Sequence, residues 1–138
     1  MPPLPEPRGI VCFGEALIDF LVGALVPREA RVFGQFAGGV LANAAVAVAK
    51  LGGRCEFVGM VGQDMFGDFL LDSLREARAG TCYVRRAARA NTALAFVSLD
   101  AHGERNFVRL RSTGCSATRI SIPPALPKRA PSKSAATA

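Results

Sequence analysis

The chain has 138 residues, half of them hydrophobic, and a formal net charge of +6. This length fits a single domain, and the hydrophobic content favours a folded chain over a disordered one. No apolar run reaches the roughly 18 residues of a membrane-spanning helix, and residues 1–9 lack the basic segment and apolar core of a secretory signal.

Most of the excess positive charge lies at the end of the sequence. Residues 112–138 carry four basic side chains and no acidic one. Their Ser, Pro and Ala content shows no helix or strand period, so we expect a disordered tail. A folded basic face with interleaved aromatic residues is not visible, so the sequence predicts no specific nucleic-acid partner. A small basic nucleic-acid binder remains an alternative only because of this tail.

The four cysteines are far apart and form no CxxC pair. Such spacing is typical of reduced thiols in a cytosolic protein rather than of a metal site or a disulfide framework. We therefore expect a cytoplasmic location and no bound metal. The lack of a membrane-spanning apolar run predicts no membrane partner.

The first half of the sequence predicts strands and helices in alternation. Residues 10–13 form an apolar run bounded by glycine, as in a buried parallel strand. Residues 21–30 contain a glycine and a proline and predict a loop, and residues 31–36 predict a short strand. Residues 41–51, nearly all Ala, Val and Leu, predict a helix covered on most sides, and residues 55–62 predict a second buried strand.

An amphipathic helix is expected next. Asp64 is a good N-cap, and an apolar face follows at helical spacing. That face consists of Phe66, Phe69, Leu70 and Leu74. The order strand, helix, strand, helix predicts an α/β layer with a parallel sheet.

Two further features follow this helix. Residues 82–86 predict a third short strand. Residues 92–110 contain two β-rich runs around a glycine at position 103, which is a hairpin signal. Both faces of this hairpin are fairly apolar, so we expect it to meet a partner: a second subunit, a substrate or a further part of a sheet.

Polar and glycine residues stand at the mouth of the apolar helix. Gly38 and Gly39 would let a ligand approach the backbone closely, and a helix N-terminus offers free N–H groups. Asn43 adds a donor and an acceptor, so this segment suits a ligand rich in hydroxyl groups or an anion. The alternative is that the glycines only form a tight turn and Asn43 caps the helix. The spacing matches neither GxGxxG nor GxxxxGK[ST].

Asp19 is the second candidate. It follows the first strand after a short apolar turn, and ligands of open α/β sheets bind beyond the carboxyl ends of the strands. A carboxylate at that place can accept hydrogen bonds from sugar hydroxyls. An ordinary loop aspartate is the alternative.

Four segments together resemble the start of the pfkB, or ribokinase-like, family of carbohydrate kinases, with bacterial fructokinases nearest. They are "CFGEALIDF", "AGGVLANAAVAVAKLGG", "EFVGMVGQDMFGDFLLDSLREA" and "TALAFVSLDAHGERNF". The resemblance runs from residue 10 to residue 108. One position departs from the family signature, which usually has a small residue or proline in place of Leu41.

The resemblance implies a fold and a site. The fold would be the N-terminal part of a three-layer α/β/α sandwich, with residues 10–111 in the kinase domain and residues 92–109 in a β lid that also forms a dimer contact in many members. Asp19, Gly38, Gly39 and Asn43 would bind the sugar, with fructose the first choice, and Phe96 is a candidate to cover its ring. Mg-ATP would be the phosphate donor.

The catalytic motif of the family is not in this sequence. Members have a Gly-Ala-Gly-Asp motif whose aspartate deprotonates the sugar hydroxyl, and no "GAGD" occurs here. We expect a truncated, inactive sugar-binding fragment, with residues 112–138 translated in a shifted frame. The alternative is a non-catalytic sugar-binding or interaction module.

Overall fold

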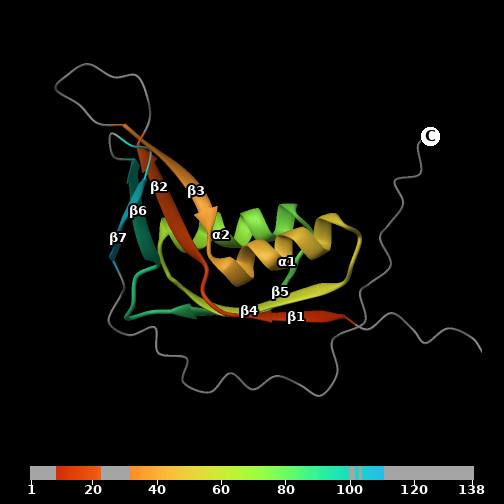
Figure 1. Ribbon diagram of the computed structural model, residues 1–138. Coiled ribbons are helices and arrows are strands. Elements are labelled where there is room, and N and C mark those ends of the chain that lie inside the picture. Colours follow the sequence, from red (N-terminus) through yellow and green to blue (C-terminus); the bar gives the residue numbers. More distant parts are fainter. Residues whose placement is uncertain (1–8, 23–31, 100–101, 103, 111–138) are drawn as a thin grey trace, which may run out of the picture.

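The computed structural model describes residues 9–22, 32–99, 102 and 104–110. Within these ranges the chain forms strands and helices in mixed α/β order (Figure 1). In chain order they are β1 (Ile10–Phe13), β2 (Leu17–Val22), β3 (Phe33–Gly38), α1 (Val40–Lys50), β4 (Cys55–Gly62), α2 (Met65–Glu76), β5 (Gly80–Ala87), β6 (Ala93–Leu99) and β7 (Arg105–Leu110). The expected tail, residues 112–138, and most of residues 1–9 lie outside the described residues.

A three-stranded parallel sheet, in the order β1-β4-β5, carries both helices on one face (Figure 1). Its central strand, β4, is apolar along most of its length, as expected for a strand buried on both sides. Phe57 and Val61 of β4 lie in one core with Ala45 of α1 and Leu70 of α2. The predicted alternation of strands and helices is therefore confirmed.

A four-stranded sheet, in the order β3-β2-β6-β7, rises at a steep angle from the first (Figure 1). β2 pairs in parallel with β6 and in antiparallel with β3, and β7 forms the predicted hairpin with β6. Phe20 of β2 meets Phe66 of α2 edge to face, with ring centroids 5.8 Å apart. This contact packs the four-stranded sheet against the helical layer.

The prediction for residues 16–22 is wrong. We expected a short turn and then a loop from residue 21, whereas Leu17–Val22 form β2. Ile18, Phe20 and Val22 alternate with Asp19 and Leu21, which is the period of a strand. Pairing with β3 on one side and β6 on the other supplies the backbone hydrogen bonds of this segment.

The second helix begins as predicted but buries a different face in part. The Asp64 side chain accepts a hydrogen bond from the Gly67 N–H at 2.8 Å, which makes Asp64 the N-cap. Leu70 and Leu74 are buried, whereas Phe69 is exposed and Leu71 takes the place expected for it. Position 71 faces the core because the helix packs on β4 and β5 at once.

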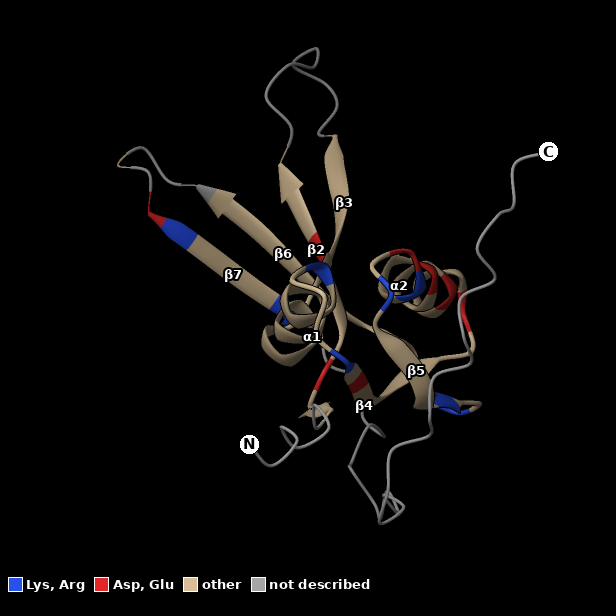
Figure 2. Cartoon of the chain, turned by 90° about the vertical axis from the view of Figure 1, so that its right-hand side faces the viewer, with Lys and Arg blue, Asp and Glu red and all other residues tan. Residues whose placement is uncertain are grey.

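The two helices differ in charge. In Figure 2, acidic and basic residues gather on α2, whereas α1 has one charged residue, Lys50, in its last turn. Ala42, Ala45 and Ala49 form the buried stripe of α1, which lets its backbone approach the sheet closely. Within the described ranges, no helix is long and apolar enough to cross a membrane.

The described cysteines Cys12, Cys55 and Cys82 are free thiols, as expected; Cys115 lies outside the described residues. Cys12 of β1 and Cys55 of β4 are buried, with their sulfur atoms 3.6 Å apart. Burial, together with the neighbouring Cys12, raises the pKa of Cys55 to about 12. The Cys55 thiol therefore stays neutral, and the two buried cysteine side chains pack as small apolar groups.

Candidate functional site

Asp19 is the third residue of β2 and is half-buried. Its neighbours across the sheet are Phe36 of β3 and Ala95 of β6. No hydrogen bond or ion pair joins the Asp19 carboxylate to another described side chain. A carboxylate in a strand with its acceptor oxygens unused by its neighbours can accept hydrogen bonds from a ligand.

Gly38 lies directly against this carboxylate. A Cβ built on Gly38 would overlap Oδ2 of Asp19 and lie 2.8 Å from its Cγ. Any larger residue at position 38 would therefore displace the acidic group. The structure thus brings together two of the residues that the sequence singled out.

The backbone conformation at position 39 requires glycine. Its φ is 107°, in the range that favours glycine, and a Cβ there would collide with the main-chain oxygen of Glu15. Gly39 is also the N-cap residue of α1, and its carbonyl accepts the N–H of Asn43 at 2.9 Å. The tight-turn interpretation is therefore correct for Gly39, although the turn also places the N-terminus of α1 beside the end of β3.

Asn43 is not a helix cap. It lies within α1 and is exposed, and α1 has no side-chain cap hydrogen bond. The alternative that Asn43 only caps the helix is therefore wrong. Its amide has no hydrogen-bond partner among the described side chains, so it is available to a ligand at the N-terminal end of α1.

Two small apolar residues share the sheet face of Asp19. Because directly paired residues point to the same side of a sheet, Ala95 stands beside Asp19 and Val97 beside Leu21. Ala95 and Val97 are buried. Sequence reasoning missed them, because both faces of the predicted hairpin are apolar and only the register with β2 tells the faces apart.

The expectation for Phe96 is wrong. Phe96 pairs with Phe20 and stacks on its ring, with centroids 5.1 Å apart. Phe20 in turn contacts Phe66 of α2. Phe96 therefore lies on the face opposite Asp19 and cannot cover a sugar that is bound to that carboxylate.

An ion pair borders the same face. Arg109 of β7 is paired with Ala95, and its Nη1 lies 3.8 Å from Oε1 of Glu15, which precedes β2. Both side chains are about half exposed, so the pair adds little stability. Its position matters more, because it joins the outermost strand of the four-stranded sheet to the segment that leads into β2.

A metal centre is not visible. In residues 9–22, 32–99, 102 and 104–110, no group of three or more His, Cys, Asp or Glu side chains could hold a metal ion. The donors that Mg²⁺ prefers are carboxylates and other oxygens arranged around one point. The described residues therefore do not fit a magnesium site, and no step is assigned to a metal here.

Comparison with known proteins identifies the family of this chain. The family model for pfkB family carbohydrate kinases matches residues 7–119. The chain is 47% identical over 104 residues to the probable fructokinase-7 of Arabidopsis thaliana, covering 74% of this chain and 30% of that protein. It is 47% identical over 105 residues to fructokinase-1 of Oryza sativa subsp. japonica, covering 75% of this chain and 32% of that protein.

Solved structures give the same answer. The crystal structure of fructokinase from Xylella fastidiosa has a TM-score of 0.71 and 59% identity, covering 75% of this chain and 34% of that one. The structure of fructokinase with bound ATP from the same organism has a TM-score of 0.71 and 56% identity, covering 77% and 34%. The chain thus spans about a third of the length of the relatives it matches. It belongs to the pfkB family of carbohydrate kinases.

Proposed function

We propose that the chain supplies the sugar-binding wall of an ATP-dependent kinase of the fructokinase type. The observation that carries the proposal is the unpaired carboxylate of Asp19, seated against Gly38 where β3 leads into α1. Carboxylates that accept two hydroxyl hydrogen bonds are well suited to sugars. Fructose is the first choice because the curated relatives are named fructokinases.

Each site residue has a distinct role in this proposal. Asp19 accepts hydrogen bonds from sugar hydroxyls, and the side-chain amide of Asn43 donates and accepts at the start of α1. Gly38 keeps the space beside Asp19 free, and Gly39 lets the chain turn so that the N–H groups of α1 face the site. Ala95 leaves room on the sheet face beside Asp19.

The phosphate donor in this proposal is ATP. The fructokinase from Xylella fastidiosa that was solved with bound ATP supports this choice. The primary hydroxyl of the sugar attacks the γ-phosphorus, a new P–O bond forms, and the bond to ADP breaks. The proton of the hydroxyl goes to a base, which in the family is the aspartate of the Gly-Ala-Gly-Asp motif. This chain contributes orientation of the sugar, which is a large part of catalysis in phosphoryl transfer.

Titration calorimetry with fructose, ribose and ATP tests the proposal. We expect fructose to bind to the 138-residue chain and ATP not to bind, because no Gly-Ala-Gly-Asp motif occurs in its sequence. Binding of ribose in preference to fructose would make ribose the proposed substrate. Binding of neither sugar would contradict the proposal. A stand-alone sugar-binding module would also bind sugar without ATP, and reading the coding DNA beyond the Arg111 codon separates that module from a kinase fragment.

A homodimer through the four-stranded sheet is part of the proposal. Phe107, Val108 and Leu110 of β7 are more than half exposed, although they are large and apolar. An edge strand of that kind favours pairing with another chain. Sedimentation of the chain should show a dimer, and Val108→Asp should weaken that dimer.

We also propose that this protein is located in the cytoplasm.

A further inference from the structure

The chain passes between the two sheets at three places. Residues 14–16 lead from β1 to β2, Gly39 leads from β3 to α1, and residues 88–92 lead from β5 to β6. The first two contain glycine and meet each other, since Gly39 lies against the backbone of Glu15. The third ends at Thr92, the one polar side chain among the described residues that is buried, at 4% exposure.

Thr92 makes three hydrogen bonds, two of them to Asp64. Oδ2 of Asp64 accepts the Thr92 N–H at 2.8 Å, and Oδ1 accepts the Thr92 hydroxyl at 2.7 Å. The same hydroxyl oxygen accepts the N–H of Gly62, at the end of β4, at 3.0 Å. One carboxylate therefore joins the end of β4, the start of α2 and the start of β6.

The backbone segments around these bonds pack too closely for a side chain at either of two glycines. A Cβ on Gly62 would overlap Oδ2 of Asp64 and lie 2.6 Å from the Thr92 nitrogen. A Cβ on Gly67 would overlap the carbonyl oxygen of Gly62 and lie 3.1 Å from Oγ1 of Thr92. Backbone segments this close are fixed relative to one another.

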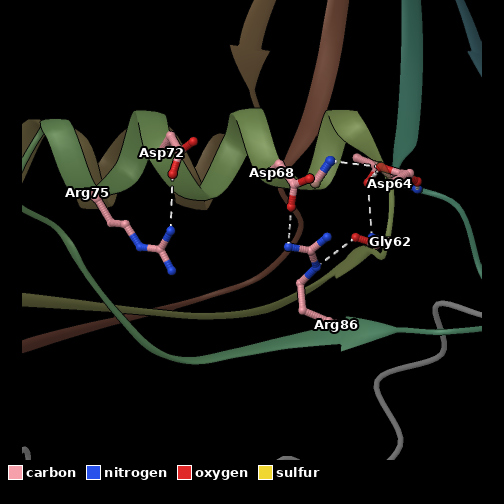
Figure 3. Close-up of polar contacts among 8 residues, drawn as sticks. Gly62, Asp64, Asp68, Asp72, Arg75 and Arg86 are labelled. Atoms are coloured by element: carbon pink, nitrogen blue, oxygen red, sulfur yellow. Dashed lines mark hydrogen bonds and ion pairs between the residues drawn. The ribbon is translucent and has the colours of Figure 1, made fainter.

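An arginine closes the arrangement from β5. Arg86 donates from Nε to the carbonyl of Gly62 at 3.0 Å and from Nη1 to Asp68 at 2.6 Å (Figure 3). Asp68 and Asp64 lie one turn apart on the same side of α2. The ends of β4 and β5 are thereby tied to the first turn of α2, next to the point where β6 begins.

The anchored residue is three positions from the candidate site. Ala93 pairs with Leu17, and Ala95 pairs with Asp19. We infer that Asp64 is a positioning residue for the sugar site, which acts through Thr92 to fix the start of β6 and thereby the place of Ala95 beside Asp19. The part of this inference that concerns the sugar rests on the proposed function, whereas the placement of β6 does not.

Asp64→Asn separates the two roles of this side chain, which caps α2 and accepts the N–H of Thr92. Asn is as good an N-cap as Asp, and its Oδ1 can still accept from Gly67 and from the Thr92 hydroxyl. Its amide nitrogen, however, would face the N–H of Thr92, so two donors would meet. We expect hydrogen exchange of the amides of residues 93–97 to become about tenfold faster or more, with exchange in α2 unchanged.

Three matched variants make the measurement specific. Asp72→Asn removes an exposed charge from the same helix, where Asp72 pairs with Arg75 (Figure 3), and should leave exchange in β6 unchanged. Thr92→Ser keeps the hydroxyl and should preserve protection of β6. Thr92→Val removes the hydroxyl, leaves the N–H of Gly62 without its acceptor, and should behave like Asp64→Asn.

Two hydrogen-exchange results would overturn the inference. One is unchanged exchange in β6 of Asp64→Asn, and the other is equal acceleration in α2 and β6, which a purely structural cap would give. Fructose titration adds a second readout, because affinity should fall about tenfold in Asp64→Asn and stay near the wild-type value in Thr92→Ser. Equal affinity in Asp64→Asn and wild type would also overturn the inference. A wild-type chain that binds no sugar would contradict the proposed function, while the exchange data would still decide on the anchor.

Discussion

At the scale of single residues, the account depends on the contact between Gly38 and Asp19. A methyl group at position 38 would overlap the carboxylate, and overpacking of that kind typically costs about 1–3 kcal/mol. We predict that Gly38→Ala lowers the unfolding free energy by about that amount and abolishes measurable fructose binding. Urea unfolding and titration calorimetry measure the two effects.

Gly34→Ala is the matched control on the same strand. A Cβ at position 34 would meet the edge of the Phe36 ring, which is exposed and can rotate away. The affinity of Gly34→Ala for fructose should therefore remain close to that of wild type. Equal losses in both variants would mean that β3 tolerates no substitution, and the special role of Gly38 would be lost.

Asp64 gives a prediction about pH. Burial alone would raise the pKa of Asp64, but hydrogen bonds from Thr92, Gly67 and Phe66 outweigh it and hold that pKa below its ordinary value. The ionised form therefore stabilises the fold above the unfolded pKa of about 3.9, and this stability is lost as pH falls through the folded pKa. We predict that, below about pH 4, wild type loses unfolding free energy more steeply than Asp64→Asn.

The comparison with Asp64→Asn is needed because Glu56 changes the unfolding free energy with pH in the opposite direction to Asp64. Burial raises the pKa of Glu56, so its contribution is present at low pH and is lost as pH rises above its ordinary pKa. Glu56 is present in both proteins, so its contribution cancels when the unfolding free energies of wild type and Asp64→Asn are subtracted at each pH. Parallel curves down to pH 2 would show that Asp64 has an ordinary pKa.

At the scale of elements, the small residues of α1 set its distance from the sheet. Ala45 is fully buried in the core, whereas Ala47 is exposed on the same helix. Ala45→Leu should lower the unfolding free energy by about 1–3 kcal/mol, because the added carbons have no space. Ala47→Leu should change it by less than about 0.5 kcal/mol. A well-tolerated Ala45→Leu would mean that α1 does not pack closely on β4.

The sequence predicted most elements because their signals are local. β4 and α1 are strongly apolar, and Asp64 is a standard N-cap, so each was found within a residue or two. β2 was missed, although Ile18, Phe20 and Val22 alternate correctly, because a glycine and a proline follow closely. The faces of β6 could not be assigned, since the choice between Ala95 and Phe96 depends on pairing with a distant strand.

At the scale of the whole molecule, the described part has open sheet edges. β1 and β5 are the edges of the three-stranded sheet, and Val11 and Phe13 of β1 are exposed. Unpaired edges with apolar side chains favour aggregation. We predict that the 138-residue chain expresses poorly and shows no ATP-dependent phosphorylation of fructose, since its sequence contains no Gly-Ala-Gly-Asp. Robust turnover in a coupled assay for ADP would contradict this.

The coding DNA offers a separate test at the same scale. Basic residues without acidic ones follow Arg111, and the family model matches as far as residue 119. We expect a shifted reading frame beyond the Arg111 codon to encode a Gly-Ala-Gly-Asp motif. Reading all three frames decides this, and the lack of such a motif in every frame would favour the binding module.

The most direct test of the central claim is titration of fructose into the wild-type chain and into Asp19→Asn. The account predicts that wild type binds fructose and that Asp19→Asn, which loses the charged acceptor but little volume, binds at least about tenfold more weakly. Glu15→Gln, which neutralises a nearby exposed carboxylate, should bind like wild type. Equal affinity of Asp19→Asn and wild type would show that the sugar, if bound, lies elsewhere, and the account would be wrong.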